Sequence, residues 1–367
     1  MKRILVINPF GIGDVIFSMS LVEAVRQADP AVVIGFLCNE RTVDLVRLNT
    51  SIDHTFIFHR DLFRRLWRKS PLLFFRKLRA LLAMIREYRF DTAFDLSLGR
   101  EFSFFCRWVG IKRSIGFDYK GRGLFLTDKV KMDGYSEKPV AQSQSELLEK
   151  VGIFPNAVSS ILPLKASELT HKEVSDLLRK RGVLEHDRLI ALAPGGGKSW
   201  GEHAVYKQWD PERFAEAANV FCKGGRFRII LLGDAREQGL LERTASCLRV
   251  PAVIVAGEAI EKVCALLLRT EFLLCNDGGL LHLANALDVK TVSIFGPVDE
   301  KVYGPLGGRS AREVVTEPVP CRPCYQRFHF PPCPYERRCL GELSVDKVVA
   351  AMKKVNEQAP KAPVEGS

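Results

Sequence analysis

The sequence reads RILVINPFGIGDVIFSMSLVEAVRQA from residue 3 to residue 28. The short apolar run at its start, residues 3–8, predicts a buried β-strand, and a loop with two glycines follows it directly. We expect a helix from about Asp14 to Ala28. A strand, a tight loop and a helix in this order are typical of a parallel sheet covered by helices, so the stretch predicts an α/β fold.

The same alternation of strands and helices continues along the chain in two series. Further strands are expected at residues 32–38, 55–58 and 90–96, and then at 189–193, 228–232, 252–255, 272–276 and 291–295. A stretch with Pro, Ser and charged residues, 155–187, is expected to be a connector that carries one helix. We therefore predict two Rossmann-like domains, residues 1–165 and 185–345, which face a central cleft with ligands at the carboxyl ends of the strands. The Pro- and Ala-containing tail, residues 356–367, is expected to be disordered.

Bulk composition restricts the class of protein. The chain has 367 residues and a formal net charge of +11, a length that favours two domains. It contains no apolar run long enough to span a membrane and no signal-peptide pattern at its start, so we expect a cytoplasmic protein. The positive charge would suit nucleic acid, an anionic membrane surface or a phosphorylated substrate, and it is also compatible with a soluble protein that is simply basic.

Two glycine-containing loops resemble nucleotide-binding motifs but lack a required residue. The loop with Gly11 and Gly13 has Ile16 where a dinucleotide-binding fingerprint needs its third glycine, which disfavours a nicotinamide oxidoreductase. Its glycines still permit a tight turn that presents Asp14 at the start of a helix, although an acid that only stabilises the helix would give the same pattern. The second loop, GGGKS at residues 195–199, has Leu192 where a P-loop needs glycine, so Lys198 is not a P-loop lysine.

The segment NDGGLLH, residues 276–282, combines a strand end, an acid, two glycines and the start of a helix. The free N–H groups of a helix start can bind a phosphate without a cation. Asp277 and His282 could hold an oxygen of a ribose or phosphate. An Asp-Gly turn that caps a buried helix, with His282 packed in the core, explains the pattern equally well.

Five motifs in the same order resemble glycosyltransferase family 9, the heptosyltransferases. They are ILVINPFGIGDVI (4–16), FDLSLGREFSFFCRWVGIKRSIGF (94–117), Ala193-Pro194-Gly195 followed by Lys207-Gln208-Trp209, LLGDARE (231–237), and NDGGLLHLANAL followed by TVSIFGPVDEKVYGP (276–305). The likeness covers roughly residues 1–350. It implies a fold of the GT-B type with two Rossmann-like domains.

The resemblance also implies roles for individual residues. It places the family's catalytic aspartate at Asp14, in the acceptor loop with Gly11 and Gly13. Lys207, rather than Lys198, matches the phosphate-binding lysine. The remaining donor-binding positions that the resemblance implies are Glu237, Asp277, Gly278, Gly279 and His282. Gly278 departs from the family pattern, which has Thr or Ser after the motif aspartate, so one hydroxyl contact to the donor is missing.

The implied reaction is an inverting transfer of a heptose, or a related sugar, from an ADP-sugar to a hydroxyl of a lipopolysaccharide core acceptor. Asp14 would act as general base on the acceptor hydroxyl. Lys207 and backbone N–H groups after Asp277 would stabilise the leaving diphosphate, so no cofactor or metal is required. The expected partners are a nucleotide-sugar donor, a lipid-linked saccharide acceptor and an anionic membrane surface, and not nucleic acid.

Two further features are not explained by these motifs. Cys321, Cys324, Cys333 and Cys339 could form a structural zinc site, but the spacing of the last two is unusual for zinc, and packed or redox-active thiols are favoured. Residues 60–89 contain ten Lys or Arg residues and only two acids, and the apolar and aromatic side chains expected beside these charges are Leu62, Phe63, Leu66, Trp67, Phe74 and Phe75. This pattern predicts peripheral attachment to the inner face of the cytoplasmic membrane, whereas a solvated basic helix with an ordinary packed stripe is the alternative.

Two other functions fit part of the sequence. A nucleotide-sugar epimerase would share the two-domain architecture but would release free sugar products without an acceptor. A non-enzymatic protein that binds zinc or nucleic acid would use the cysteines and the positive charge, but it leaves the paired Rossmann motifs unexplained.

Overall fold

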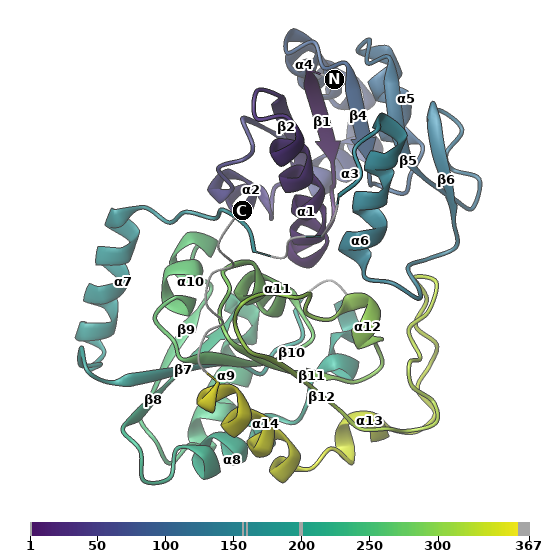
Figure 1. Cartoon of the computed structure of the whole chain (residues 1–367). Helices are drawn as coiled ribbons and strands as arrows, with labels where there is room; N and C mark the ends of the chain where they lie inside the picture. The colour runs from purple at the N-terminus through teal and green to yellow at the C-terminus, as the bar shows by residue number, and fades with distance from the viewer. Residues whose placement is uncertain (1, 156–157, 159–160, 198–200, 359–367) are drawn as a thin grey trace. The chain divides into compact units, whose positions relative to one another are not determined.

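The computed structural model describes residues 2–155, 158, 161–197 and 201–358. The chain divides into two compact units, Met1–Lys165 and Ala166–Ser367. Each unit consists of one parallel sheet with helices around it (Figure 1).

The described part of the first unit contains a sheet of six strands. These are β1 (Arg3–Ile7), β2 (Val33–Asn39), β3 (His54–Phe58), β4 (Thr92–Asp95), β5 (Arg113–Tyr119) and β6 (Asp128–Met132). The spatial order is β3-β2-β1-β4-β5-β6, and neighbouring strands are parallel. This order is that of a Rossmann fold, in which the direction of winding reverses between β1 and β4 and leaves a ligand-binding crevice at the carboxyl ends of those strands.

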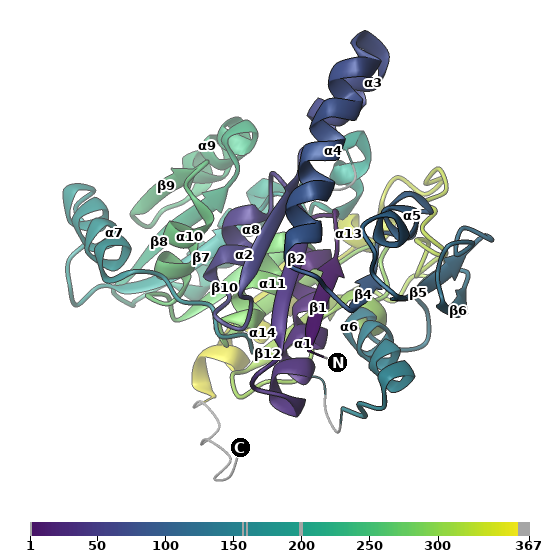
Figure 2. The same ribbon diagram turned by 90° about the horizontal axis from the view of Figure 1, so that it is seen from above.

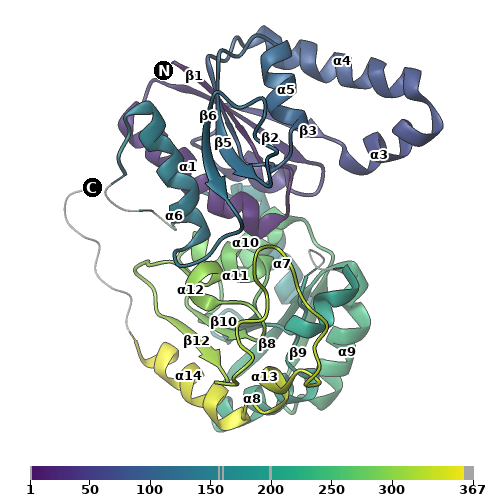
Figure 3. The same cartoon turned by 90° about the vertical axis from the view of Figure 1, so that its right-hand side faces the viewer.

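The described residues of this unit form seven helical segments. They are α1 (Ile12–Ala28), α2 (Val43–Leu48), α3 (Arg60–Lys69), α4 (Pro71–Glu87), α5 (Glu101–Trp108), α6 (Val140–Ser145) and the 3₁₀ helix η1 (Glu146–Val151). Part of the apolar core forms where Leu5 and Ile7 of β1 pack with Leu81 and Ile85 of α4. Figures 2 and 3 show α3 and the start of α4 as a helical hairpin that extends beyond the edge of the sheet.

The second unit repeats the same topology. Its strands are β7 (Arg188–Ala193), β8 (Phe227–Gly233), β9 (Ala252–Ala256), β10 (Phe272–Asn276), β11 (Thr291–Phe295) and β12 (Arg312–Thr316), in the order β12-β11-β10-β7-β8-β9. Because β7 is the first strand of this unit and β10 the fourth, the winding reverses between them, as it does between β1 and β4. Trp209 and Phe214 are fully buried in the core of this unit.

The helices of the second unit are mostly short. They are α7 (Glu168–Lys180), η2 (Gly201–Lys207), α8 (Pro211–Phe221), η3 (Ala235–Glu237), α9 (Gln238–Cys247), α10 (Ile260–Leu267), α11 (Gly279–Ala286), α12 (Glu300–Tyr303), α13 (Arg338–Gly341) and α14 (Val345–Glu357). The stretch expected to be a connector thus contains α7, which lies in the second unit. Helix α14 continues to Glu357, two residues into the expected tail, and residues 359–367 lie outside the described part of the chain.

The expected α/β class is confirmed, but three strands were missed. Strand β6 reads DKVKM and β12 reads REVVT, and both lie at an edge of their sheet. An edge strand has one neighbour and much solvent contact, so it carries charged residues instead of the apolar run by which buried strands are identified. Strand β5 contains Gly116 and Asp118, two residue types that are uncommon in strands, so its sequence did not indicate a strand.

Candidate active site

The loop between β1 and α1 is held by side chains of two asparagines. Asn8 donates from Nδ2 to the carbonyl of Asp14 over 2.9 Å and accepts from the Phe10 N–H at its Oδ1 over 3.2 Å. Asn39, at the end of β2, donates to the carbonyl of Pro9 over 2.8 Å. Two side chains at the ends of sheet strands therefore hold the backbone around Asp14 in place.

Asp14 lies in the first turn of α1, which begins two residues earlier than expected. Its Oδ2 accepts a hydrogen bond from the Gly11 N–H over 3.3 Å, and the side chain is partly exposed. The position is at the carboxyl end of β1, where the topology reverses and where Rossmann folds bind ligands. The carboxylate thus combines an orienting contact with access to solvent, as a general base requires.

Tyr135 is a neighbour of Asp14 that the sequence did not reveal. Burial raises the pKa of its hydroxyl well above the ordinary value, and the negative charge of Asp14 raises it further. The hydroxyl oxygen accepts a hydrogen bond from Nε2 of Gln144 over 3.1 Å. A tyrosine in the irregular segment after β6 belongs to no motif, so no sequence signal could have found it.

Asp95 ends β4, the strand next to β1, and its Oδ1 accepts from the Ser97 N–H over 3.0 Å. Burial raises the pKa of this carboxyl to about 6. A second acid thus lies at the carboxyl ends of the two strands where the winding reverses.

In the second unit, Lys207 and Asp277 form a buried ion pair. Lys207 is the last residue of η2, and Asp277 directly follows β10. Nζ of the lysine lies 2.6 Å from Oδ2 of the aspartate, and the two side chains are only 8% and 5% exposed. The pair therefore places a cation beside the start of α11, at the carboxyl end of the strand where this unit reverses its winding.

His282 lies one turn into α11, on the same side as this pair. Its Nε2 is 4.0 Å from Oδ1 of Asp277. Burial lowers the pKa of the imidazole to about 4, and Lys207 lowers it further, although Asp277 acts in the opposite direction. The ring is therefore neutral at pH 7 and adds a hydrogen-bonding group to the site without adding charge.

Asn276 joins the segments that surround the ion pair. Its Oδ1 accepts from the Trp209 N–H over 3.0 Å, and its Nδ2 donates to the carbonyl of Pro194 over 2.8 Å. The side chain is almost fully buried. It thus fastens the end of β10 to the segments that follow η2 and β7, a role that the sequence analysis did not assign to it.

Glu237 lies against the glycine loop after β7. Its carboxylate accepts from the N–H groups of Asp234 over 2.9 Å and Gly197 over 3.4 Å. A Cβ at Gly195 would collide with this carboxylate, so a larger residue there would displace the Glu237 side chain. The neighbouring Lys198 lies outside the described residues.

Gly278 and Gly279 form the turn into α11. Gly279 is the first residue of the helix, and Gly278 precedes it in an extended conformation that any residue can adopt. A Cβ built at Gly278 would have its nearest neighbour, the Gly196 carbonyl oxygen, at 3.7 Å, which is ordinary contact. A Cβ would thus fit here, so the backbone does not force the absence of the hydroxyl residue that the family pattern has.

The structure assembles some of the expected residues and separates others. Five of them lie at the start of α11: Lys207, Asp277, Gly278, Gly279 and His282. Gly196 of the glycine loop packs closely against η2, since a Cβ added to it would lie 2.7 Å from the Ala204 carbonyl oxygen. Gly11, Gly13 and Asp14 belong to the first unit.

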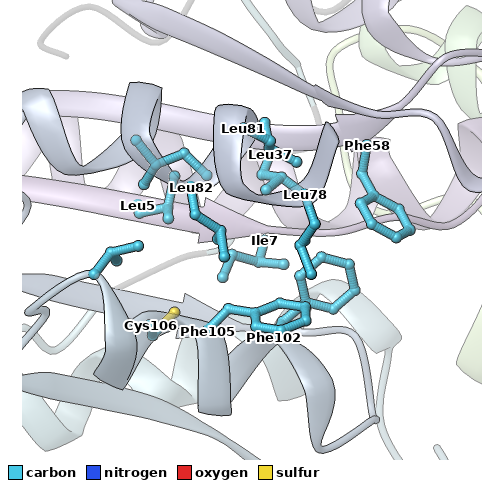
Figure 4. Close-up of a pocket in the computed structure, with 12 residues that line it drawn as sticks. Leu5, Ile7, Leu37, Phe58, Leu78, Leu81, Leu82, Phe102, Phe105 and Cys106 are labelled. Atoms are coloured by element: carbon cyan, nitrogen blue, oxygen red, sulfur yellow. The ribbon is translucent and has the colours of Figure 1, made fainter. Parts of the chain in front are cut away.

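An apolar pocket in the first unit contains none of the expected site residues. Figure 4 shows its lining side chains, which come from β1, β2, β3, α4 and α5 and include Leu5, Leu37, Phe58, Leu82 and Phe102. These side chains offer no charged or strongly polar group to bind a nucleotide. The pocket is therefore an imperfection in core packing and not the candidate active site.

The four C-terminal cysteines line one small pocket, together with Tyr206 and Phe330. Sγ of Cys324 donates to the Cys321 carbonyl over 2.9 Å, and burial, with Cys321 as a further cause, raises the pKa of the Cys324 thiol to about 11. Within the described part of the chain, no group of three or more His, Cys, Asp or Glu side chains is arranged to hold a metal ion.

Comparison with known proteins identifies the family. Residues 78–330 match glycosyltransferase family 9 (heptosyltransferase). The chain belongs to this family. It is a glycosyltransferase, and the match includes Lys207, Asp277 and His282 but begins after Asp14.

Individual relatives agree with the family match. The chain is 25% identical to lipopolysaccharide heptosyltransferase 1 of Pseudomonas aeruginosa over 89% of its own length and 86% of the relative. Among solved structures, it resembles the ADP-heptose lps heptosyltransferase II of Escherichia coli with a TM-score of 0.74 and 19% identity, covering 97% of this chain and 98% of that one. A family 9 glycosyl transferase from Veillonella parvula has a TM-score of 0.79 and 18% identity, with 97% of both chains covered. These structural likenesses show that the family 9 glycosyltransferase has the expected GT-B fold.

Family membership sets aside the epimerase and the non-enzymatic protein as alternatives. In the described residues, no helix combines the length and the apolar character needed to cross a membrane.

Proposed function

We propose that this family 9 glycosyltransferase moves a heptose from ADP-heptose to a hydroxyl group of a lipopolysaccharide core acceptor. The relatives named above supply the donor and the acceptor class, since they are heptosyltransferases of lipopolysaccharide. The observation that carries the proposal is the buried Lys207–Asp277 pair at the start of α11, within the segment that matches the family.

The pair suits a diphosphate leaving group. As the bond between the anomeric carbon and the diphosphate oxygen breaks, negative charge grows on the diphosphate. The ammonium group of Lys207 and the first N–H groups of α11 would stabilise that charge, and Asp277 would hold the lysine in place. Neutral His282 would form a hydrogen bond with an oxygen of the nucleotide-sugar, and it would add no charge beside the lysine.

Asp14 would be the general base. It would take the proton of the acceptor hydroxyl as its oxygen attacks the anomeric carbon on the face opposite the diphosphate, which inverts the configuration. Asp14 belongs to the first unit and Lys207 to the second, so the proposed reaction needs groups from both. With Lys207 and backbone N–H groups on the diphosphate, the reaction would need no metal ion.

The test is to incubate the purified protein with a panel of nucleotide-sugars, with and without a lipid-linked core saccharide, and to measure diphosphate release. We expect ADP to appear from ADP-heptose when the acceptor is present, together with a heavier saccharide. Conversion of a nucleotide-sugar to free sugar without an acceptor would contradict the proposal and indicate epimerase chemistry.

We also propose that the protein is cytoplasmic and docks on the inner face of the cytoplasmic membrane through α3 and α4. All ten basic side chains of this region are exposed: Arg60, Arg64, Arg65, Arg68, Lys69, Arg76, Lys77, Arg79, Arg86 and Arg89. Each cation near anionic lipid contributes about 1 kcal/mol of binding free energy. A lipid-linked acceptor must be met at such a surface.

The hairpin divides its apolar residues between packing and exposure. Phe63, Leu66, Leu78 and Leu82 are buried, so the expectation that Phe63 and Leu66 lie beside the charges at the surface is wrong. Phe63, Leu78 and Leu82 pack in one apolar cluster, because both helices need an apolar face to hold them together. Trp67, Leu72 and Phe75, in contrast, are 59%, 84% and 56% exposed, close to the turn between the helices.

Co-sedimentation with vesicles tests the docking. We expect binding to vesicles with phosphatidylglycerol, loss of binding at high salt, and no binding to pure phosphatidylcholine. Changing Arg64, Arg65, Arg68 and Lys69 to Gln should abolish binding. The control variant changes four exposed basic residues in α7 and directly after it to Gln, and it should still bind the vesicles. These residues are Lys172, Arg179, Lys180 and Arg181. Absence of vesicle binding at low salt, or equal losses in both variants, would overturn the docking proposal.

A further inference from the structure

Residues 319–340, which follow β12 and contain the four C-terminal cysteines, form a segment without a role in the reaction so far. We call them the cysteine-rich segment. One part of it contacts the turn after β11. The N–H groups of Cys324 and Tyr325 donate to the carbonyl of Pro297 over 2.9 and 3.0 Å. Arg322 donates from Nε to the Gly296 carbonyl over 2.6 Å.

The other end of the segment contacts η2, the short helix that ends at Lys207. Nη1 of Arg337 donates to the carbonyl of Val205 over 3.1 Å and to that of Gln208 over 3.3 Å. These two carbonyls stand on either side of Lys207 in the sequence. A single guanidinium thus ties together the backbone before and after the lysine.

Aromatic contacts reinforce this attachment. The centroid of the Phe330 ring lies 5.0 Å from that of the Tyr206 ring and 5.9 Å from that of the His203 ring, and both of these residues belong to η2. A 3₁₀ helix of seven residues has poorer hydrogen-bond geometry than an α-helix and depends on tertiary contacts for its position. The cysteine-rich segment provides such contacts to η2 through both Phe330 and Arg337.

The backbone of Arg337 is itself held in an unusual conformation. Its φ of 61° lies in the left-handed region, which is unfavourable for a residue with a side chain. The N–H of Arg337 donates to Sγ of Cys333 over 3.4 Å, and its carbonyl accepts from the Leu340 N–H over 2.8 Å at the start of α13. Such a conformation persists only where surrounding contacts determine it.

We infer that Arg337 is a positioning residue for Lys207. The inference rests on the proposed function, in which Lys207 binds the donor diphosphate. By holding the carbonyls of Val205 and Gln208, Arg337 fixes the short helix so that the ammonium group of Lys207 keeps its place beside Asp277. Loss of the guanidinium lets η2 shift, and the donor diphosphate then meets a displaced cation. Arg337 is not among the donor-binding residues proposed above, so we assign its effect to the position of Lys207.

The experiment compares Arg337→Ala and Arg337→Lys with Arg338→Ala. Arg338 is a matched control, since this exposed neighbour pairs with Glu342 over 2.6 Å and has no bond to η2 in the described structure. ADP binding is measured by titration calorimetry, together with KM for ADP-heptose, kcat and thermal unfolding.

We expect Arg337→Ala to raise the Kd for ADP and the KM for the donor by roughly tenfold, the size of one lost charge-assisted hydrogen bond. kcat should fall as well, because Lys207 stabilises the charge that grows on the diphosphate as the bond breaks. Arg337→Lys should recover part of the loss, because an ammonium group can bond one of the two carbonyls. Arg338→Ala should match the unchanged protein in each measurement.

Two results distinguish a failure of the inference about Arg337 from a failure of the proposed role of Lys207. If Lys207→Ala weakens ADP binding but Arg337→Ala binds ADP within about twofold of the unchanged protein, the inference about Arg337 is wrong. If Lys207→Ala leaves ADP binding unchanged, the proposed function of Lys207 fails first. A folded Arg337→Ala protein that loses kcat alone, with KM unchanged, would also overturn the positioning role.

Discussion

The ammonium nitrogen of Lys207 lies 2.6 Å from Oδ2 of Asp277, and both side chains are almost completely removed from solvent. A buried pair of this kind is costly to break, because removal of one member leaves the other as an uncompensated charge. A substitution at either position therefore affects stability and donor binding together. The two effects have to be separated by experiment.

Lys207→Ala should weaken ADP binding and slow transfer, and it should also destabilise the fold by about 3–5 kcal/mol because Asp277 is left unpaired. The double variant Lys207→Ala, Asp277→Asn removes both charges. It should regain much of the stability without regaining ADP binding. Thermal unfolding and calorimetric titration with ADP measure the two effects, and recovery of ADP affinity in the double variant would contradict the assignment.

Lys198→Ala is the comparison that decides between the two lysines. Lys198 follows the glycine loop that resembles a P-loop, and its replacement should change neither ADP affinity nor turnover strongly. The reverse pattern, with a large loss for Lys198→Ala and a small one for Lys207→Ala, would show that the wrong lysine has been chosen.

Asp14→Asn should keep the fold and ADP binding but lower kcat by about two or more orders of magnitude, since general-base catalysis typically contributes about 10²- to 10⁴-fold. Asparagine preserves the size of the side chain and can still accept from the Gly11 N–H, but it cannot take a proton. Asp29→Asn, at the opposite end of α1, is the control and should keep full activity. Near-normal kcat in purified Asp14→Asn would rule out the base.

His282 should make the protein less stable in acid. The pKa of its imidazole is about 4 in the folded protein against 6.5 without the fold, so the unfolded chain binds the extra proton first as the pH falls. This contribution to stability is complete above pH 6.5 and is lost between pH 6.5 and 4, with a slope of at most about 1.4 kcal/mol per pH unit. In His282→Gln, denaturant unfolding should depend less on pH in that interval. An unchanged pH dependence would mean that the imidazole titrates normally.

A strong chelator should leave transfer activity intact. The proposed stabilisation of the leaving diphosphate comes from Lys207 and the N–H groups at the start of α11, not from a metal ion. Activity is measured before and after dialysis against the chelator, with the metal content and the circular dichroism spectrum recorded in parallel. A complete loss of activity without unfolding, reversed by a divalent ion, would contradict the prediction.

The strands and loops at the centre of both sheets could be predicted because their residues are constrained locally. Strand β10 and the turn after it are an uninterrupted apolar run followed by Asn276, Asp277 and two glycines, and the structure places them as expected. Strands β6 and β12 could not be found in this way, because their charged residues suit an edge that only the assembled sheet defines. The basic region 60–89 was partly misjudged for the same reason, since only packing decides that Phe63 is buried and Trp67 is exposed.

The sequence by itself determined the α/β class and placed Asp14 in the first turn of a helix and Asp277 directly after a buried strand, because these are local patterns. Lys207 was assigned only through the Lys-x-Trp motif of the family resemblance. Only the tertiary structure decided what those residues touch. The contact between Lys207 and Asp277 joins residues 70 positions apart in the sequence. The neighbours Tyr135 and Arg337 come from irregular segments without a motif. Contacts between distant segments depend on how the strands are ordered in the sheet, and no local spacing of residues encodes that order.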